Sequence, residues 1–421
     1  MEIQRGHYGL CDESIFEQVI DAGRLVVMAG IVDSHVHVNE PGRTDWEGFE
    51  TATKAAAAGG ITTIVDMPLN CSPVTTSVQA LETKLACMPG KCHVDVAFWG
   101  GVVPGNQHEL VPMVKAGVVG FKCFLIHSGL DEFPNVSEAD LHLAMTQMKG
   151  TNSVLLFHAE LDSCGCTDVT GDVTKYETFL ASRPREWEQD AIKLVCRLCL
   201  QYKVRCHIVH LSSGDAVPII RQAQSEGAPL TVETCNHYLT LYAEEVPTGA
   251  TEYKCAPPVR EKSNQDVLWE AIGSGVIQTI VSDHSPCPPE MKNPETGNFM
   301  TAWGGISSLQ FGLSLFWTGA KEKGFSLRQV QRLLCENTAA LCHLDGSKGS
   351  IAVGKDADFV IWDPEATIMI ETGMIQHRHK LTPYLNRPFY GVVHKTIVRG
   401  RIVYEANQPI PSASGQPILL Q

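Results

Sequence analysis

Residues that could bind metal ions stand at the ends of several short apolar segments of this chain. The segment "GIVDSHVHVNEPG" contains His35 and His37. Side chains two residues apart on a β-strand leave the same face, so both imidazoles can reach one cation. Later segments end in four more candidates, which are Lys122, His158, His210 and Asp283. Four imidazoles and one carboxylate suffice for two zinc-like cations, provided that an anion bridges the two ions.

Lys122 is a candidate for that bridge, although an unmodified ammonium group cannot bind a cation. The residue stands between Phe121 and Cys123 in an apolar segment. Burial disfavours the charged form of a lysine and therefore lowers its pKa. A neutral amine can add carbon dioxide and become a carbamate, an anion with two oxygens that suits a bridging position. The alternative is that Lys122 is a barrel lysine held in an ion pair.

The two-residue period of side chains along a strand also distinguishes the other histidines. His207 and His210 are three residues apart and so point to opposite faces of their strand. His210 lies nearer the end of the strand and is the better ligand, whereas His207 is expected to be a packed histidine. His237 and His284 are left open between lining the site and a structural role, and structure is favoured for His237.

Eight apolar, β-branched segments alternate with helical stretches and must position these side chains. Helices are expected at Glu47–Ala58, Glu138–Lys149 and Glu188–Tyr202. Continuous apolar strands that alternate with helices indicate a parallel sheet covered on its faces, and eight such units predict a (β/α)8 TIM barrel of the α/β class. Reactive groups of such barrels lie at the carboxyl ends of the strands. The eight segments are "GIVDSHVHV", "TTIVDM", "VDVAFWGG", "GFKCFLI", "SVLLFHAE", "RCHIVHLSS", "LTVETCNHYL" and "VIQTIVSDHSP".

The pattern changes after the eighth segment. Helices are expected near Ile306–Trp317 and Ser326–Leu341, followed by alternating segments with Gly and Asp turns that predict antiparallel strands. We therefore expect a barrel domain at residues 31–348 and a small β-sandwich domain built mainly from residues 349–421. Residues 1–30 are expected to add one strand, "RLVVMAG", to the small domain.

Composition excludes several classes of protein. The 421 residues are 44% hydrophobic and carry a net charge of −14, without a basic run that would bind nucleic acid or an anionic membrane. The 15 cysteines are an odd number and are scattered, which favours reduced thiols inside a cell. The pair Cys164 and Cys166 is interpreted as a structural loop rather than a metal clip. A polar start without a signal peptide favours the cytoplasm, with mitochondrion and peroxisome left open.

The motifs resemble those of the amidohydrolase superfamily, in its cyclic amidase branch of dihydroorotases, hydantoinases and allantoinases. The resemblance covers nearly the whole chain and rests on "VDSHVHVNEPG", "FKCF", "FHAE", "VHLSS", "ETCNHYL", "KCAPPVRE", "SDHSP", "ENTA" and "GSIAVGKDADFVIWD". It implies two divalent metal ions per subunit, most simply zinc, and a homotetramer. By this resemblance one metal is held by His35, His37 and Asp283, and the other by His158 and His210. Carboxylated Lys122 and a hydroxide bridge the two ions, and Asp283 is the catalytic general base.

The same resemblance bears on the substrate. Dihydroorotases carry Arg at the position of Asn39, where a guanidinium holds the substrate carboxylate. An Asn cannot neutralise a carboxylate, so a neutral substrate fits better; Asn39 also suits an Asx turn. The segments "FKCFLIHSGLDEFPNV" and "TAWGGISSLQ" are similar to those of allantoinases. This implies allantoin as the small-molecule substrate, hydrolysed to allantoate in purine degradation, with contacts from Asn39, Ala256, Trp303 and Gly304.

Three expectations remain open at this level. A hydantoinase or dihydropyrimidinase is the alternative activity, and a non-catalytic or inactive isoform of the family is the alternative to an enzyme. Family members also have several strands before the barrel, whereas this chain reaches its first histidine motif at Gly30. We therefore expect the N-terminal strands of the small domain to be incomplete and its edges to be exposed.

Overall fold

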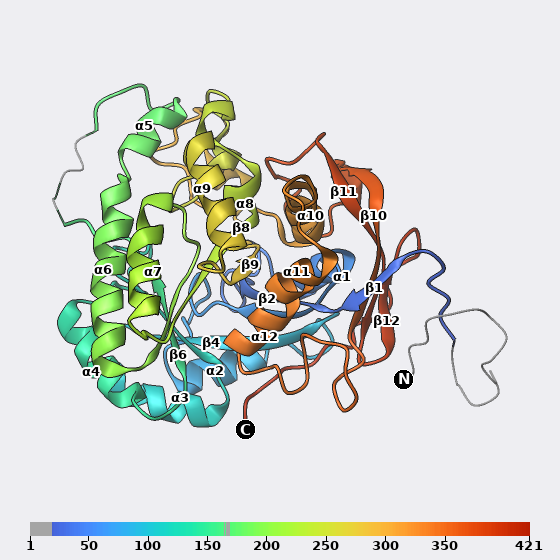
Figure 1. The fold of residues 1–421 in the computed structure, drawn as a ribbon, viewed down its shortest axis with the longest axis horizontal. Helices are drawn as coiled ribbons and strands as arrows, with labels where there is room; N and C mark the ends of the chain where they lie inside the picture. The colour runs from blue at the N-terminus through green and yellow to red at the C-terminus, as the bar shows by residue number, and fades with distance from the viewer. Residues whose placement is uncertain (1–18, 164, 166–168) are drawn as a thin grey trace.

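The computed structural model describes residues 19–163, 165 and 169–421. Cys164, Cys166 and most of the predicted N-terminal segment lie outside the described residues. Within them, the chain forms an eight-stranded parallel sheet surrounded by helices and a separate four-stranded antiparallel sheet (Figure 1). The TIM-barrel fold predicted from the eight apolar segments is therefore confirmed.

The barrel strands follow one another around the sheet in the order of the sequence. Every residue of strands β3 and β5 is buried, which agrees with apolar strands that are covered by helices outside and by side chains inside. The strands are β2 (Ile31–Val36), β3 (Ile61–Asp66), β4 (Asp95–Gly101), β5 (Gly120–Phe124), β6 (Val154–His158), β7 (Arg205–Ile208), β8 (Leu230–Cys235) and β9 (Thr279–Val281).

The first and last barrel strands meet through main-chain and side-chain hydrogen bonds. The His37 amide donates to the His284 carbonyl at 2.9 Å. The Ser282 amide donates to the buried Asp33 carboxylate at 3.2 Å, and that carboxylate also accepts from the His35 amide at 3.1 Å. Closure of the barrel therefore places His35 and His37, at the carboxyl end of β2, beside Asp283, which follows β9.

The helices largely occupy the predicted positions, with two exceptions. The helix expected near Ile306–Trp317 begins only at Gly312, because Ile306 forms a β-bridge with His284 and Ser308 bonds to the end of β9. The helix expected at Ser326–Leu341 is divided by a π-helical stretch, Arg332–Glu336. The α-helices are α1 (Phe49–Ala58), α2 (Val78–Leu85), α3 (Leu110–Ala116), α4 (Glu138–Met148), α5 (Tyr176–Ala181), α6 (Arg185–Tyr202), α7 (Val217–Ser225), α8 (Asn236–Thr240), α9 (Lys262–Gly273), α10 (Gly312–Glu322), α11 (Leu327–Gln331) and α12 (Asn337–Leu341).

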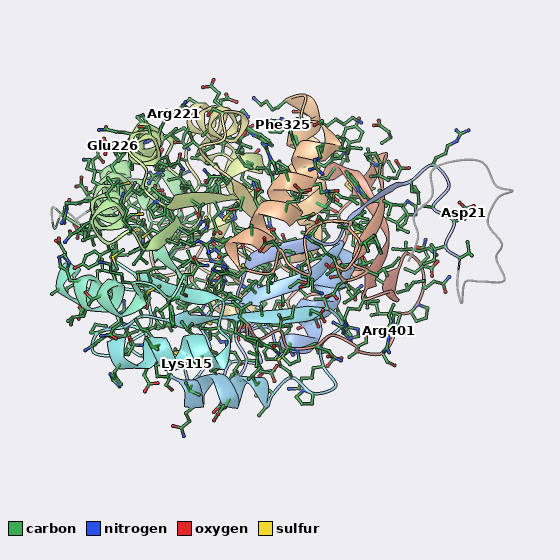
Figure 2. All side chains as sticks on the ribbon, turned by 60° about the horizontal axis from the view of Figure 1, so that its bottom comes forward. Asp21, Lys115, Arg221, Glu226, Phe325 and Arg401 are labelled. Carbon is green, nitrogen blue, oxygen red and sulfur yellow. The ribbon has the colours of Figure 1, made fainter. Side chains whose placement is uncertain are left out.

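The second sheet combines strands from both ends of the chain. Its order is β1 (Val26–Ala29), β10 (Phe359–Met369), β11 (Pro388–Val398) and β12 (Arg401–Glu405), all antiparallel. It lies on one side of the barrel next to α1 and α10 (Figure 1). Figure 2 shows that side chains fill the space between the layers, whereas charged residues such as Lys115, Arg221 and Glu226 lie on the outside.

A buried lysine joins the barrel to the second sheet. The Lys348 ammonium lies 2.7 Å from Asp95 of β4, 2.8 Å from Asp358 and 2.9 Å from Asp356, and only 2% of its side chain is exposed. Asp95 also pairs with Arg399, which follows β11. Burial of charges is tolerated here because each carboxylate has a cationic partner.

Replacing this lysine should strongly destabilise the fold. Lys348→Met would leave Asp95 and Asp358 buried and facing each other without their shared cation. We expect a loss of about 3 to 5 kcal/mol in the free energy of unfolding, measured by denaturant titration followed by circular dichroism. Lys193→Met is the control, because Lys193 pairs with Asp190 on the surface and should matter little. Equal stability of the two variants would show that Lys348 is not an organising contact.

Candidate metal centre

Three of the six predicted ligands form a compact group at the mouth of the barrel. The Nε2 atoms of His35 and His37 lie 3.2 and 3.4 Å from the same carboxylate oxygen of Asp283. All three side chains are buried. Their donor atoms lie within 4.8 Å of one another, and two imidazoles with one carboxylate are a donor set that suits zinc.

Hydrogen bonds on the far side of each ring direct these histidines toward Asp283. His35 Nδ1 lies 2.5 Å from Glu233 Oε1, and His37 Nδ1 lies 3.2 Å from the Asn70 side-chain amide. A carboxylate at Nδ1 fixes the proton there and leaves the Nε2 lone pair free to bind a cation. His35 Nε2 has no hydrogen-bond partner among the described residues, which agrees with this arrangement.

The second predicted pair lies next to the first. The rings of His158 and His210 meet edge to face with centroids 4.5 Å apart, and the His210 ring lies 5.5 Å from that of His35. His158 Nε2 lies 2.7 Å from Glu160, which in turn pairs with Arg183. His210 Nδ1 is buried without a partner among the described residues. Burial lowers the pKa of both histidines, so both are neutral and able to act as ligands.

Lys122 is buried among these groups and has no salt bridge among the described residues. Its ammonium lies 5.2 Å from the centre of the Phe124 ring. Burial lowers its pKa to about 8, partly opposed by the negative charges of Asp283 and Glu233. The ion-paired barrel lysine considered as an alternative is therefore not what the structure contains, and a neutral amine is accessible near physiological pH.

Backbone geometry also distinguishes the site. His210 and Asp283 have φ angles of 39° and 43°, and Asn39 has a φ of 67°. Residues other than glycine rarely adopt positive φ, and such residues are concentrated at functional sites. The chain turns sharply at these strand ends and loops, which changes the direction of the side chains relative to the strand.

Glu233 is the residue that the sequence reasoning missed. It accepts from His35, from His207 at 3.1 Å, and from the His210 amide at 3.1 Å. Burial opposes its ionisation, but the interactions with His35 and His207 outweigh burial and lower the pKa of Glu233 to about 2. A carboxylate within the apolar strand segment "LTVET" was the available signal, because buried carboxylates require partners.

The remaining histidines have separate roles. His207 is fully buried and is held by Thr231 as well as Glu233. His284 contacts Glu47 and accepts from the Ser308 amide, so it anchors the segment after β9. His237 is also buried, yet neither ring nitrogen has a partner among the described residues, and it lies near Asp283. His237 can therefore line the site.

Among the predicted substrate-contacting residues, Asn39 and Trp303 each have a buried side-chain polar atom without a partner among the described residues. The Asn39 amide nitrogen donates to the Pro286 carbonyl at 3.3 Å, whereas its Oδ1 atom is buried without a partner among the described residues. Gly304 lies against Ala256, since a Cβ atom at Gly304 would be 3.8 Å from the Ala256 nitrogen. The Trp303 ring meets Trp46 edge to face at 4.9 Å.

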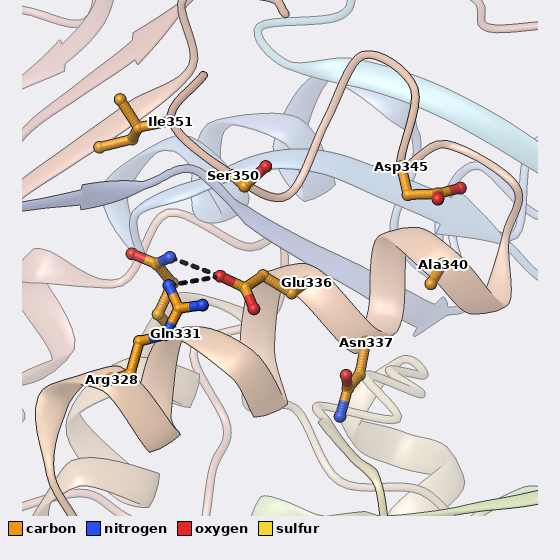
Figure 3. Close-up of a pocket in the computed structure, with 8 residues that line it drawn as sticks. All are labelled: Arg328, Gln331, Glu336, Asn337, Ala340, Asp345, Ser350 and Ile351. Carbon is orange, nitrogen blue, oxygen red and sulfur yellow. Dashed lines mark hydrogen bonds and ion pairs between the residues drawn. The ribbon is translucent and has the colours of Figure 1, made fainter.

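A separate hollow of about 700 Å³ lies between α11, α12 and the loop that follows them (Figure 3). Polar and charged side chains dominate its lining, and Arg328 and Glu336 pair within it. None of the residues predicted for the metal centre takes part. The lining residues are Arg328, Gln331, Glu336, Asn337, Ala340, Asp345, Ser350 and Ile351.

A parallel barrel with histidines at the carboxyl end of its first strand and an aspartate after its last defines a hydrolase of the amidohydrolase type. The chain belongs to the amidohydrolase family, whose model matches residues 26–403. Among curated relatives, "Allantoinase, mitochondrial" of Aquarana catesbeiana is 62% identical over 327 residues, which cover 78% of this chain and 68% of the relative. The allantoinase of Streptomyces avermitilis is 48% identical and covers 90% and 84%.

Solved structures support the same grouping. The L-hydantoinase (dihydropyrimidinase) from Arthrobacter aurescens has a TM-score of 0.90 and 33% identity, covering 97% of this chain and 92% of that one. Together the family and these relatives identify the chain as a cyclic amidohydrolase enzyme. No helix among the described residues is long and apolar enough to cross a membrane.

The hydrogen bond between Glu233 and His35 can be tested through metal affinity. Glu233→Gln should weaken the orientation of His35, because a neutral amide replaces the carboxylate that holds the Nδ1 proton. We expect metal affinity to fall about 10- to 100-fold, measured by competition with a chromogenic chelator. Glu270→Gln, at an exposed site on α9, is the matched control. Unchanged affinity in a folded Glu233→Gln protein would contradict this role.

Proposed function

We propose that this enzyme hydrolyses the cyclic amide bond of allantoin to give allantoate, a step of purine degradation. The observation that carries the proposal is the neutral polar lining beside the metal centre: an asparagine amide at position 39 and main-chain groups near Ala256 and Gly304. These groups match the amide edges of an uncharged ureide ring, whereas a carboxylate would require a cation. The curated allantoinase relatives support the same substrate.

We propose that the site holds two divalent cations, of which zinc suits the ligands. His35, His37 and Asp283 would hold one, and His158 and His210 the other, with N6-carboxylated Lys122 between them. The donor set fits, because burial lowers the pKa of His37, His158 and His210, the pKa of Asp283 is held low, and Lys122 has no competing salt bridge among the described residues. Bound divalent ions would polarise the amide carbonyl and make hydroxide available near neutral pH.

Asp283 is proposed as the general base. Burial opposes ionisation of its carboxyl group, but His35 and His37 outweigh burial and hold the pKa of Asp283 below its usual range. The carboxylate is therefore ready to take a proton from the attacking water molecule. It can then deliver this proton to the ring nitrogen that leaves when the amide bond breaks. Proton transfer would then be carried out by a side chain that already faces the two histidines.

Substrate binding is assigned to four residues. Asn39, Ala256 and Gly304 would contact the amide edges of the ring, and Trp303 would close one side of the site against Trp46. We also propose a homotetramer, following the family resemblance. Hydantoinase or dihydropyrimidinase activity is the second candidate, because the barrel superimposes closely on the L-hydantoinase of Arthrobacter aurescens.

The substrate proposal predicts an order of turnover. The purified enzyme loaded with zinc should hydrolyse allantoin with a higher kcat/KM than hydantoin, dihydrouracil or dihydroorotate. Asn39 cannot compensate the carboxylate of dihydroorotate, and hydantoin and dihydrouracil lack the ureido arm with which allantoin can pair further polar groups of the site. Ring opening can be followed for all four compounds in one pH-stat assay. A preference for hydantoin or dihydrouracil would move the assignment to the second candidate. A preference for dihydroorotate would overturn the interpretation of Asn39.

The bridging role of Lys122 predicts coupled loss of metal and activity. Lys122→Ala should bind neither metal tightly and should lose hydrolysis, because both ions would lack their shared anion. Added short-chain carboxylic acids should restore part of both properties by supplying two oxygens in the same cavity. Metal content by atomic absorption and turnover are measured together, with exposed Lys115→Ala as the control. Full activity of Lys122→Ala would refute the bridge.

A further inference from the structure

Two buried lysines lie near the candidate site without any carboxylate partner among the described residues. Lys254 follows the short helical turn after α8, and Lys292 belongs to the loop after β9; their exposed fractions are 8% and 5%. Burial lowers the pKa of Lys292, and burial together with the charge of Lys292 lowers the pKa of Lys254 to about 7. Groups this costly to bury need compensating contacts.

Main-chain carbonyl groups provide these contacts. The Lys292 amino group donates to the carbonyls of Trp303 at 2.9 Å, Gly305, and Lys254 at 3.4 Å. The Lys254 amino group donates to the carbonyls of Ala302 at 2.5 Å and Met300 at 3.2 Å. Four carbonyls of the six-residue segment 300–305 are thus held by two lysines, much as a bound cation would hold them.

The amides of the same segment are also occupied, with one exception. The Trp303 amide donates to the Met291 carbonyl at 2.8 Å, and the Gly305 amide donates to the Lys254 carbonyl at 2.8 Å. Within residues 302–305, Gly304 alone has neither an N–H nor a C=O hydrogen bond to a described residue. Most buried main-chain N–H and C=O groups in proteins are hydrogen-bonded, so these two free groups of Gly304 are available to a ligand.

The turn has little freedom to move away from this arrangement. Gly305 has a φ of 153°, and a Cβ atom there would lie 2.2 Å from the Ser285 carbonyl oxygen. On the opposite side Gly304 lies against Cys255 and Ala256. The turn therefore lies between the segment after β9 and the segment 254–256. The hydrogen bonds from the two lysines fix its position between these segments.

From these contacts we propose that Lys292, supported by Lys254, is a positioning residue for substrate. It fixes the turn Trp303–Gly305 so that the free N–H and C=O groups of Gly304 face the ring of the substrate. The inference rests on the proposed function for the identity of the ligand. Neither lysine touches the reacting atoms, so the effect should fall on binding and not on the chemical step.

The test is the separation of KM from kcat in Lys292→Met, which keeps the length of the side chain and removes its donors. We expect KM to rise about tenfold or more, as for the loss of hydrogen bonds from a charged donor. The value of kcat should stay within about threefold, and the metal content should not change. Lys262→Met is the matched control, since the Lys262 ammonium donates to the neighbouring Gln265 side chain and, among the described residues, to no group of the turn Trp303–Gly305.

Hydrogen exchange supplies a readout that needs no substrate. In Lys292→Met, the amides of Trp303 and Gly305 should exchange faster by mass spectrometry, whereas peptides from β2 and β9 should keep their protection. If Lys292→Met does not fold, Lys254→Met and Gly305→Ala decide the question, because both disturb the same turn. An unchanged KM, or a fall in kcat alone, in a folded variant would overturn the inference.

The two proposals fail in different ways. Failure of the wild-type enzyme to hydrolyse allantoin would sink the proposed function. The effect of Lys292→Met would then be measured on whichever of the four cyclic amides the wild-type enzyme turns over fastest. If the amides of Trp303 and Gly305 exchange as slowly in Lys292→Met as in the wild-type enzyme, the positioning role is rejected whatever the substrate.

Discussion

The contact between the first and last barrel strands is the constraint on which the candidate site depends. Asp33 accepts hydrogen bonds from the His35 and Ser282 amides, and the His37 amide bonds to the His284 carbonyl. The bonds of Ser282 and His284 join segments that are almost 250 residues apart in sequence. Without this closure, the two histidines and Asp283 would belong to opposite edges of an open sheet, and these three candidate ligands would not lie together.

Two groups of buried charged side chains around this barrel have different kinds of partner, imidazole rings and main-chain carbonyls. At the candidate metal centre, carboxylates of Glu233 and Asp283 contact imidazoles, which fixes the direction of each ring. In the loops above, the hydrogen bonds that Lys254 and Lys292 donate to described residues all go to main-chain carbonyls, and Lys254 also lies over the Phe179 ring. The first arrangement leaves donor atoms ready for cations, while the second fixes a turn and leaves the N–H and C=O groups of Gly304 without a partner among the described residues.

The proposed preference for a neutral substrate agrees with this arrangement. Asp283 already supplies negative charge, and Asn39, Ala256 and Gly304 contribute amide groups without net charge. A ring with several N–H and C=O groups can satisfy such a surface, because each unpaired polar atom finds a complementary partner. On this proposal, the chemistry and the specificity would come from different loops on one barrel, as is usual for this fold.

The sequence alone determined the barrel, the order of its strands and the identity of the residues at their ends. It could do so because strand periodicity is local: residues i and i+2 share a face whatever surrounds them, which placed His35 with His37 and separated His207 from His210. Tertiary structure alone decided the rest. Glu233 gains its role only when β8 lies beside β7 and across from His35, and Lys292 meets Trp303 and Gly305 only after the loop folds back. Hydrogen bonds of this kind depend on distances between remote segments, and no local pattern of residue types encodes those distances.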